Sequence, residues 1–276
     1  MREHRIPGSP FVPVAACLTL AACTVSSPMF GVATTSSKAK GEAMLSYAEE
    51  AEALYAQGME KIDKDNCTDA KKIFERLRSQ FPFSPESVLA ELRIADCEFK
   101  EQNYAQASAR YKEFADNHGA HPDVDYATYR NALSTFMRIP KDWFILPPVY
   151  ERDQAATKEA LAKFRAFIMS YPQSQYVGEA KVHMVSCMKQ LAEHELYVAR
   201  FYLKKKKYDG ALARAQTVVD KYQESGLVPD AIFIMAETYL KAGKKDQARI
   251  TFMKIMEDFP QSFQAKQAER YLEALE

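Results

Sequence analysis

The sequence predicts an all-α protein, a right-handed α-solenoid of five helix pairs followed by a C-terminal capping helix. Three observations predict this fold. The chain of 276 residues has only nine glycines, which weighs against a turn-rich β-sandwich or barrel. A motif recurs in which an alanine is followed four residues later by an aromatic side chain. Most of these units end in a proline, which cannot continue a helix.

Composition and charge exclude two classes of protein. The chain has 37 basic and 37 acidic residues and a formal net charge of zero, so it lacks the basic surface that bulk nucleic-acid binding requires. Hydrophobic residues make up 47 %, too many for a disordered chain. We therefore expect a folded protein without a nucleic-acid partner.

Residues 1–22 are predicted to be a signal peptide. Basic Arg2 and Arg5 precede the apolar stretch Phe11–Ala22, which is shorter than the roughly 20 residues that span a bilayer. The stretch ends in Leu-Ala-Ala-Cys, which resembles the lipobox of bacterial lipoproteins, in which the cysteine is acylated. We therefore predict Cys23 as the lipidation site. The alternatives are an ordinary secretory signal, a buried helix, and a weaker lipobox that ends at Cys17.

Residues 23–41 are predicted to be a flexible tether. Thr24–Gly41 is rich in Ser, Thr, Ala and Gly, a composition typical of linkers. By resemblance to lipoproteins of enteric bacteria, Thr24 after the cysteine favours the outer membrane. A multiply acylated Cys23 would give stable anchoring without a spanning helix.

Five repeat units follow the tether. Their alanines are spaced 37, 53, 51 and 37 residues apart: Ala70, Ala107, Ala160, Ala211 and Ala248. The position four residues later holds Phe74, Tyr111, Phe164, Ala215 and Phe252. The pattern resembles the tetratricopeptide repeat, a helix–turn–helix unit of 34 residues. The alanine allows two helices to approach closely, and the aromatic side chain lies on the same helix face.

Two helices in each of the five units, followed by a capping helix, give the expected helices in chain order. They are Glu42–Asp63, Thr68–Gln80, Pro85–Lys100, Tyr104–Asn117, Pro122–Met137, Asp153–Ser170, Gln175–Leu203, Tyr208–Gln223, Pro229–Lys241 and Lys244–Asp258, with Phe263–Leu275 as the cap.

The two long spacings indicate departures from a plain array. Arg138–Arg152 is an insertion within the third unit and contains Trp143, the only tryptophan. Its apolar run either folds back on the solenoid or contacts a partner or the membrane interface. The fourth unit begins with an unusually long helix.

The insertion and the long helix narrow the choice among families of repeat proteins. The chain resembles the BamD (ComL/YfiO) family of outer-membrane β-barrel assembly lipoproteins from Leu45 to about Phe259. The resemblance rests on Tyr47–Tyr55, Phe81–Pro85, His121–Tyr129, Arg152–Gln154, Tyr171–Tyr176 and Leu191–Tyr202.

The resemblance implies a membrane-anchored scaffold at the periplasmic face of the outer membrane. Its C-terminal repeats, residues 174–276, would bind a POTRA domain of a BamA-like barrel protein, in company with other lipoproteins of the machinery. Its N-terminal repeats, residues 42–173, would offer a groove to unfolded barrel substrates. The alternative is another periplasmic repeat lipoprotein that coordinates cell-wall or division functions.

Candidate binding residues follow in two groups. Aromatic side chains of the first two units are candidates for a peptide groove, with packing between repeats as the alternative that we expect for most of them: Tyr55, Phe81, Phe83 and Tyr104. The fourth unit supplies the candidates for the partner surface, of which Arg214 is implied by the resemblance: Glu195, Tyr197, Arg200, Lys204, Lys207 and Arg214. The Lys204–Lys207 run either offsets the helix dipole or attracts an acidic partner.

Cys67 and Cys97 are a candidate disulfide. Cys67 occupies the position that Tyr104 and Tyr208 hold in other units, and should pack against the next helix, where Cys97 lies. An oxidising periplasm would allow the bond; otherwise both remain buried thiols. Cys187 is expected to stay unpaired as a small buried side chain.

No catalytic pattern is present. The chain lacks a Gly-rich phosphate loop, a Gly-x-Ser-x-Gly motif and a Cys-x-x-Cys motif, and its histidines do not cluster. We therefore expect a protein that is not an enzyme and that needs no cofactor or metal.

Overall fold

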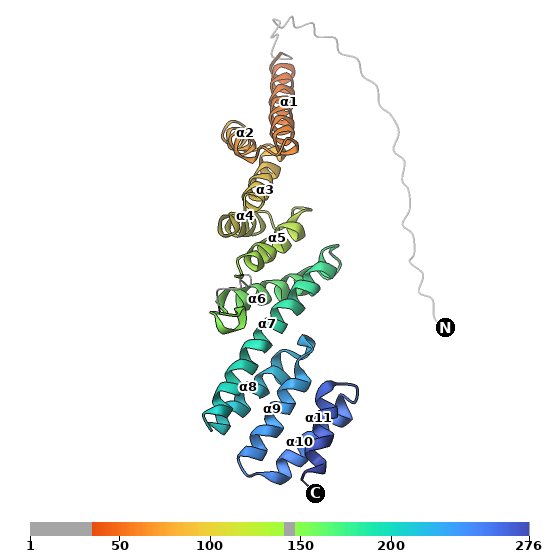
Figure 1. Ribbon diagram of the computed structural model, residues 1–276. Helices are drawn as coiled ribbons and strands as arrows, with labels where there is room; N and C mark the ends of the chain where they lie inside the picture. The colour runs from red at the N-terminus through yellow and green to blue at the C-terminus, as the bar shows by residue number, and fades with distance from the viewer. Residues whose placement is uncertain (1–34, 141–146, 276) are drawn as a thin grey trace, which may run out of the picture. The chain divides into compact units, whose positions relative to one another are not determined.

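The computed structural model describes residues 35–140 and 147–275, which are helical throughout their regular structure (Figure 1). The described helices, in order, are α1 (Thr35–Asp63), α2 (Cys67–Gln80), α3 (Pro85–Lys100), α4 (Tyr104–Asn117), α5 (Val124–Met137), η1 (Val149–Glu151), α6 (Ala155–Ser170), α7 (Val177–Lys204), α8 (Tyr208–Lys221), η2 (Gln223–Ser225), α9 (Val228–Lys241), α10 (Lys245–Asp258) and α11 (Phe263–Glu273). The predicted all-α fold of helix pairs with a terminal helix is confirmed.

Of the described residues, 45–275 belong to one compact unit. Within this unit each helix from α2 to α11 packs against the next one along the chain. Contacts of this nearest-neighbour kind define a repeat array.

Helix ends follow local chemistry. The side chain of Ser84 accepts a hydrogen bond from the backbone N–H of Ser87 at 3.1 Å, and Pro85 begins α3. Asn66 and Ser262 cap α2 and α11 in the same way, each at 3.0 Å. Such caps satisfy backbone donors that have no partner inside the helix.

One boundary differs from the prediction. The first helix was expected from Glu42, but α1 begins at Thr35, so Thr35–Gly41 is helical rather than part of the tether. Ser and Thr favour helix starts, and Lys38, Ala39 and Lys40 are good helix formers. The Ser- and Thr-rich composition is typical of linkers, so it did not predict the first helical turns of α1.

The repeated motif forms the core. All five motif alanines are fully buried, as are all five residues four positions later. Twelve residues before each of four of these alanines lies another fully buried small side chain or a glycine: Gly58, Ala95, Ala199 and Ala236. A Cβ added at Gly58 would come within 2.4 Å of the Phe74 ring, so the ring uses the space that a side chain would need.

Four of the turns inside helix pairs share one backbone conformation. Asp65, Gln102, Lys206 and Gly243 each lie two residues before the second helix with φ between 59° and 77°. In each turn, as at Lys207 N to Tyr202 O (2.9 Å) and Lys206 N to Leu203 O (3.0 Å), two backbone hydrogen bonds close the preceding helix. This Schellman arrangement favours glycine at the left-handed position, yet only one of the four turns has it.

Replacing Lys206 with glycine is therefore expected to raise the free energy of unfolding by about 0.5–1 kcal/mol, because glycine adopts the left-handed backbone without strain. Denaturant unfolding checks the change. The matched control is Gly243→Ala, at φ 77°, which should lower stability by a similar amount although its Cβ would meet no atom within 4 Å. Equal stabilities for wild type and Lys206→Gly would contradict the argument.

The described end of the insertion folds back onto the array. Tyr150 in η1 packs its ring against Tyr197 of α7 at 5.6 Å, and His194 shares a 2.6 Å hydrogen bond with the Tyr150 carbonyl. Gln154 donates to the Val149 carbonyl at 2.6 Å. Trp143 lies outside the described residues. Among the helices that the structure describes, none combines the length and apolar character needed to span a bilayer.

Candidate peptide-binding network and partner surface

A half-buried carboxylate, Asp96 on α3, lies at the centre of a polar network that joins three repeat units. Tyr111 and Tyr126 both donate their hydroxyls to its Oδ1, at 2.6 and 2.7 Å, and Arg93 donates to its Oδ2 at 2.6 Å. The Asp96 network is defined here as Tyr55, Arg93, Asp96, Tyr111, Tyr126 and Arg130. Its members come from α1, α3, α4 and α5.

Two guanidinium groups flank the carboxylate. Arg93 Nε donates to the Tyr55 hydroxyl at 3.3 Å. Arg130 Nε donates to the Tyr111 hydroxyl at 3.2 Å, and its Cζ lies 3.8 Å above the Phe99 ring. Both arginines are only partly buried. Stacking on an aromatic ring holds a guanidinium in place while leaving its other N–H groups able to donate.

Tyr111 and Tyr126 stay protonated, and so donate to Asp96, throughout the ordinary pH range. Burial and the neighbouring Asp96 carboxylate raise the pKa of Tyr111 and of Tyr126 well above the usual value. Burial disfavours the phenolate, and a nearby carboxylate repels it. The network therefore holds one anion, Asp96, between two cations.

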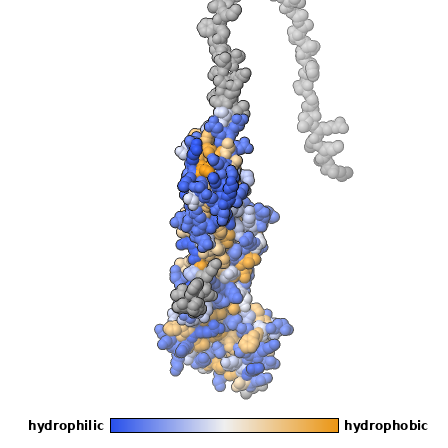
Figure 2. Space-filling model, turned by 45° about the horizontal axis from the view of Figure 1, so that its top comes forward, coloured by the Kyte–Doolittle hydropathy of each residue, from blue (hydrophilic) through white to orange (hydrophobic). Residues whose placement is uncertain are grey.

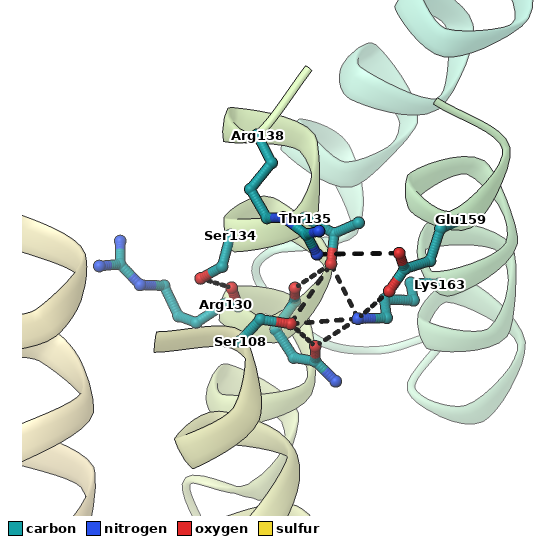
Figure 3. A network of polar contacts seen from close by, with 8 residues as sticks. Ser108, Arg130, Ser134, Thr135, Arg138, Glu159 and Lys163 are labelled. Atoms are coloured by element: carbon teal, nitrogen blue, oxygen red, sulfur yellow. Dashed lines mark hydrogen bonds and ion pairs between the residues drawn. The ribbon is translucent and has the colours of Figure 1, made fainter. Parts of the chain in front are cut away.

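A second polar network fixes the helices behind the first. Lys163 on α6 donates to Ser108, Asn131 and Thr135 at 3.1, 2.9 and 2.8 Å, and pairs with Glu159 at 2.9 Å (Figure 3). Ser134 donates to the Arg130 carbonyl at 2.7 Å. These contacts join α4, α5 and α6, so the helix that carries Tyr126 and Arg130 is held by both neighbours.

The structure does not bring the four predicted groove residues together. Tyr55 is half-buried and joins the Asp96 network, and Tyr104 packs its ring on Phe99 at 5.2 Å. Phe83 is 92 % exposed in the loop before α3. Phe81 is 7 % exposed and lies 4.9 Å from the Tyr47 ring, so assigning it to a peptide groove was wrong: it fills the core.

Sequence reasoning missed Arg93, Asp96, Tyr126 and Arg130. A signal was present, because Arg93 and Asp96 are three apart and Tyr126 and Arg130 four apart, and each pair shares a helix face. Searching only for aromatic side chains overlooked these polar pairs.

The six predicted partner residues fall in two places. Tyr197, Arg200 and Lys204 are exposed on one side of α7, together with Phe201, which is 50 % exposed. These four residues are called the α7 outer face. Since each residue turns an α-helix by about 100°, Glu195 points to the opposite side. Lys207 is exposed in the turn before α8.

Glu195 and Arg214 form an ion pair between α7 and α8. Arg214 Nη1 lies 3.1 Å from Glu195 Oε2, and the side chains are 43 % and 9 % exposed. Glu195 is thus part of the interior, while Arg214 is open to solvent on one side. Figure 2 shows hydrophilic residues over much of the face in view, with hydrophobic residues gathered in patches between them.

Comparison with known proteins decides the family. The model of the YfiO family, described as outer membrane lipoprotein, matches residues 47–252. The chain belongs to the YfiO family. The match includes every residue of the Asp96 network and of the α7 outer face. The predicted family membership is confirmed.

Curated relatives of this YfiO-family chain share one description. The outer membrane protein assembly factor BamD of Neisseria meningitidis (strain DSM 15465 / Z2491) is 31 % identical over 76 % of this chain and 80 % of its own length. The outer membrane protein assembly factor BamD of Caulobacter vibrioides (strain ATCC 19089 / CIP 103742 / CB 15) is 29 % identical over 84 % of this chain and 72 % of its own. The solved structure of a thermophilic TPR protein from Thermus thermophilus covers 82 % of this chain and 98 % of its own, with 16 % identity and a TM-score of 0.34.

Proposed function

We propose that this protein is an outer-membrane protein assembly factor, a lipid-anchored scaffold at the periplasmic face of the outer membrane. The observation that carries the proposal is the family match over residues 47–252 together with relatives described as assembly factors. A scaffold role fits a chain whose described residues form a helix-pair array, since such arrays present extended surfaces to other proteins. No enzymatic step belongs to the proposal.

The substrate side is assigned to the N-terminal repeats, residues 42–173, and to the Asp96 network in particular. An extended peptide needs donors for its carbonyls or its C-terminal carboxylate, and surfaces for alternate side chains. Partly exposed Arg93 and Arg130 supply N–H donors, and the rings of Tyr55 and Phe99 adjoin them. The proposed occupant is a strand of an unfolded barrel protein.

The partner side is assigned to the C-terminal repeats, residues 174–276. The α7 outer face combines aromatic and basic side chains, a mixture common at protein interfaces. Arg214 extends the basic surface onto α8. The proposed partner is a POTRA domain of a BamA-like barrel protein, with other lipoproteins of the assembly machinery nearby.

Isolation of the tagged protein from detergent-solubilised outer membranes tests the scaffold role. A POTRA-containing barrel protein should co-purify, and depletion of this protein should lower the amount of barrel proteins in the outer membrane. Depletion that disturbs cell division while barrel proteins stay at their normal amount would favour the alternative role in wall or division coordination.

Replacing Arg214 with glutamate is expected to weaken POTRA binding about tenfold, or ~1.4 kcal/mol, through lost electrostatic complementarity. The change also leaves the buried Glu195 beside a second carboxylate, so it should lower stability as well. Titration calorimetry measures the affinity, and thermal unfolding measures the stability.

The double variant Glu195→Gln/Arg214→Gln separates the two effects. It removes both charges and leaves no unpaired buried carboxylate, so the fold should keep most of its stability. Weakened binding in this variant supports contact between Arg214 and the partner. Wild-type affinity in the double variant would show that Arg214 serves only Glu195.

Replacing Cys23 with alanine is expected to release the protein from the membrane, because no acyl chain can then be attached. Cys23 lies outside the described residues, so the expectation rests on the lipobox resemblance. Cell fractionation with immunodetection checks it, and Cys17→Ala is the matched control that should stay membrane-bound. Release of Cys17→Ala with retention of Cys23→Ala would move the anchor to Cys17.

A further inference from the structure

Cys67 and Cys97 meet inside the first repeat boundary. Cys67 is the first residue of α2 and Cys97 lies near the end of α3. They are 6 % and 1 % exposed and belong to the same apolar cluster. Both are free thiols in the structure, and the Cys67 thiol is among the groups that raise the pKa of the Cys97 thiol, which places the two side chains close together in this cluster.

We propose that Cys67 and Cys97 form an intramolecular disulfide that links the first repeat unit to the second. The pairing goes beyond the scaffold role and rests on it only for the oxidising compartment. Disulfides form and persist in such a compartment, and these two buried thiols share one apolar cluster. The third cysteine of the described residues, Cys187, lies in a different cluster, fully buried.

The surroundings of Cys67 offer an entrance for an oxidant. Asp65, Cys67 and Lys100 line one surface hollow at the turn before α2. Lys100 interacts electrostatically with both sulfurs and pairs with Asp65 at 2.5 Å. Cys67 is therefore the sulfur that an outside disulfide donor can reach through this hollow.

The chemistry is thiol–disulfide exchange with a disulfide donor, either a thioredoxin-like oxidase or glutathione disulfide. The Cys67 thiolate attacks one donor sulfur, and the other donor sulfur leaves as a thiolate. The Cys97 thiolate then attacks the Cys67 sulfur and displaces the bound donor sulfur. Cys67 and Cys97 lose two electrons and two protons, and the donor becomes two thiols.

Cys97 is suited to the second step rather than the first. Burial raises its pKa strongly, and the Cys67 thiol raises the pKa further. A thiol with this environment reacts slowly with outside reagents but is positioned beside a mixed disulfide at Cys67. Cys187 has no partner of this kind, and burial raises its pKa to about 12.

Peptide mapping of the full chain tests the pairing. Cells exporting the protein are quenched with acid, free thiols are blocked with N-ethylmaleimide, and the membrane fraction is digested with trypsin. We expect Asp65–Lys71 to be recovered joined to Ile94–Lys100, and to separate on reduction. Val182–Lys189, which carries Cys187, should be blocked before reduction and serves as the internal control.

A second arm distinguishes failure of the pairing from failure of the proposed location. Purified, fully reduced protein is incubated with glutathione disulfide, blocked and digested. The same joined peptides are expected, and Cys67→Ser should leave Cys97 free while Cys187→Ser should not change the pairing. Joined peptides here but not in cells would contradict the periplasmic location rather than the pair. Peptides blocked singly, or carrying glutathione on each cysteine, in purified wild-type protein would overturn the proposal.

Discussion

Replacing Asp96 with alanine is expected to lower the free energy of unfolding by about 3 kcal/mol. The carboxylate accepts from Tyr111, Tyr126 and Arg93, so its removal leaves two hydroxyls and a guanidinium without their acceptor. Losing one partner of a buried charge costs more than the pair itself contributes, because the remaining groups stay desolvated. Guanidinium chloride unfolding followed by circular dichroism measures the loss.

Two further variants show whether the loss of stability comes from the Asp96 network. Asp96→Asn keeps an acceptor oxygen without the charge and should lose less stability than Asp96→Ala. Asp116→Ala removes an aspartate that is 59 % exposed and paired only with Lys112, and should change stability by less than about 0.5 kcal/mol. A loss for Asp96→Ala as small as that for Asp116→Ala would show that the network does not stabilise the fold.

Replacing Phe164 with alanine is expected to cost about 3–5 kcal/mol, the range for truncating a fully buried aromatic side chain. The ring lies in the middle of the array and contacts Tyr129, Phe136 and His183, with centroids 6.5, 6.1 and 5.5 Å away. Because stability in a repeat array is carried between neighbours, this cavity should also uncouple the two halves. Calorimetry should then show two transitions where the wild type shows one.

The matched control for Phe164→Ala is Phe83→Ala, which removes a ring that is 92 % exposed and should leave the unfolding transition unchanged. If Phe164→Ala unfolds in a single transition and loses less than about 1 kcal/mol of free energy of unfolding, the surrounding rings close the cavity.

The fold followed from the sequence because its signal is local and repeated. Ala107 and Tyr111 are four residues apart, and the same spacing in the other units places the alanine and the residue four positions later in the core, an aromatic residue in all units but the fourth. The insertion was also visible, since the spacing to Ala160 exceeds that of a plain unit. Because the helices contact mainly their neighbours along the chain, the order of the repeats in the sequence largely determines the fold.

The sites were less predictable because their contacts join distant residues. Tyr55 and Arg93 are 38 positions apart, and Asp96 and Tyr126 are 30 apart. A position in a linker predicts an open Phe81, but linker side chains next to a helix end can turn inward, as this one does against Tyr47. Closeness in sequence groups Glu195 with Tyr197, whereas helical geometry places them on different sides of α7.

The length of α7 has a mechanical consequence. In an array whose helices contact only adjacent helices, bending is distributed over all the junctions between repeats. The 28 residues of α7 form a rod of about 42 Å, and this rod contacts α5, α6, α8 and α9. It therefore stiffens the part of the array that it contacts. Under load, elastic deformation should concentrate in the earlier junctions, while a pull on the α7 outer face is transmitted as far as α5.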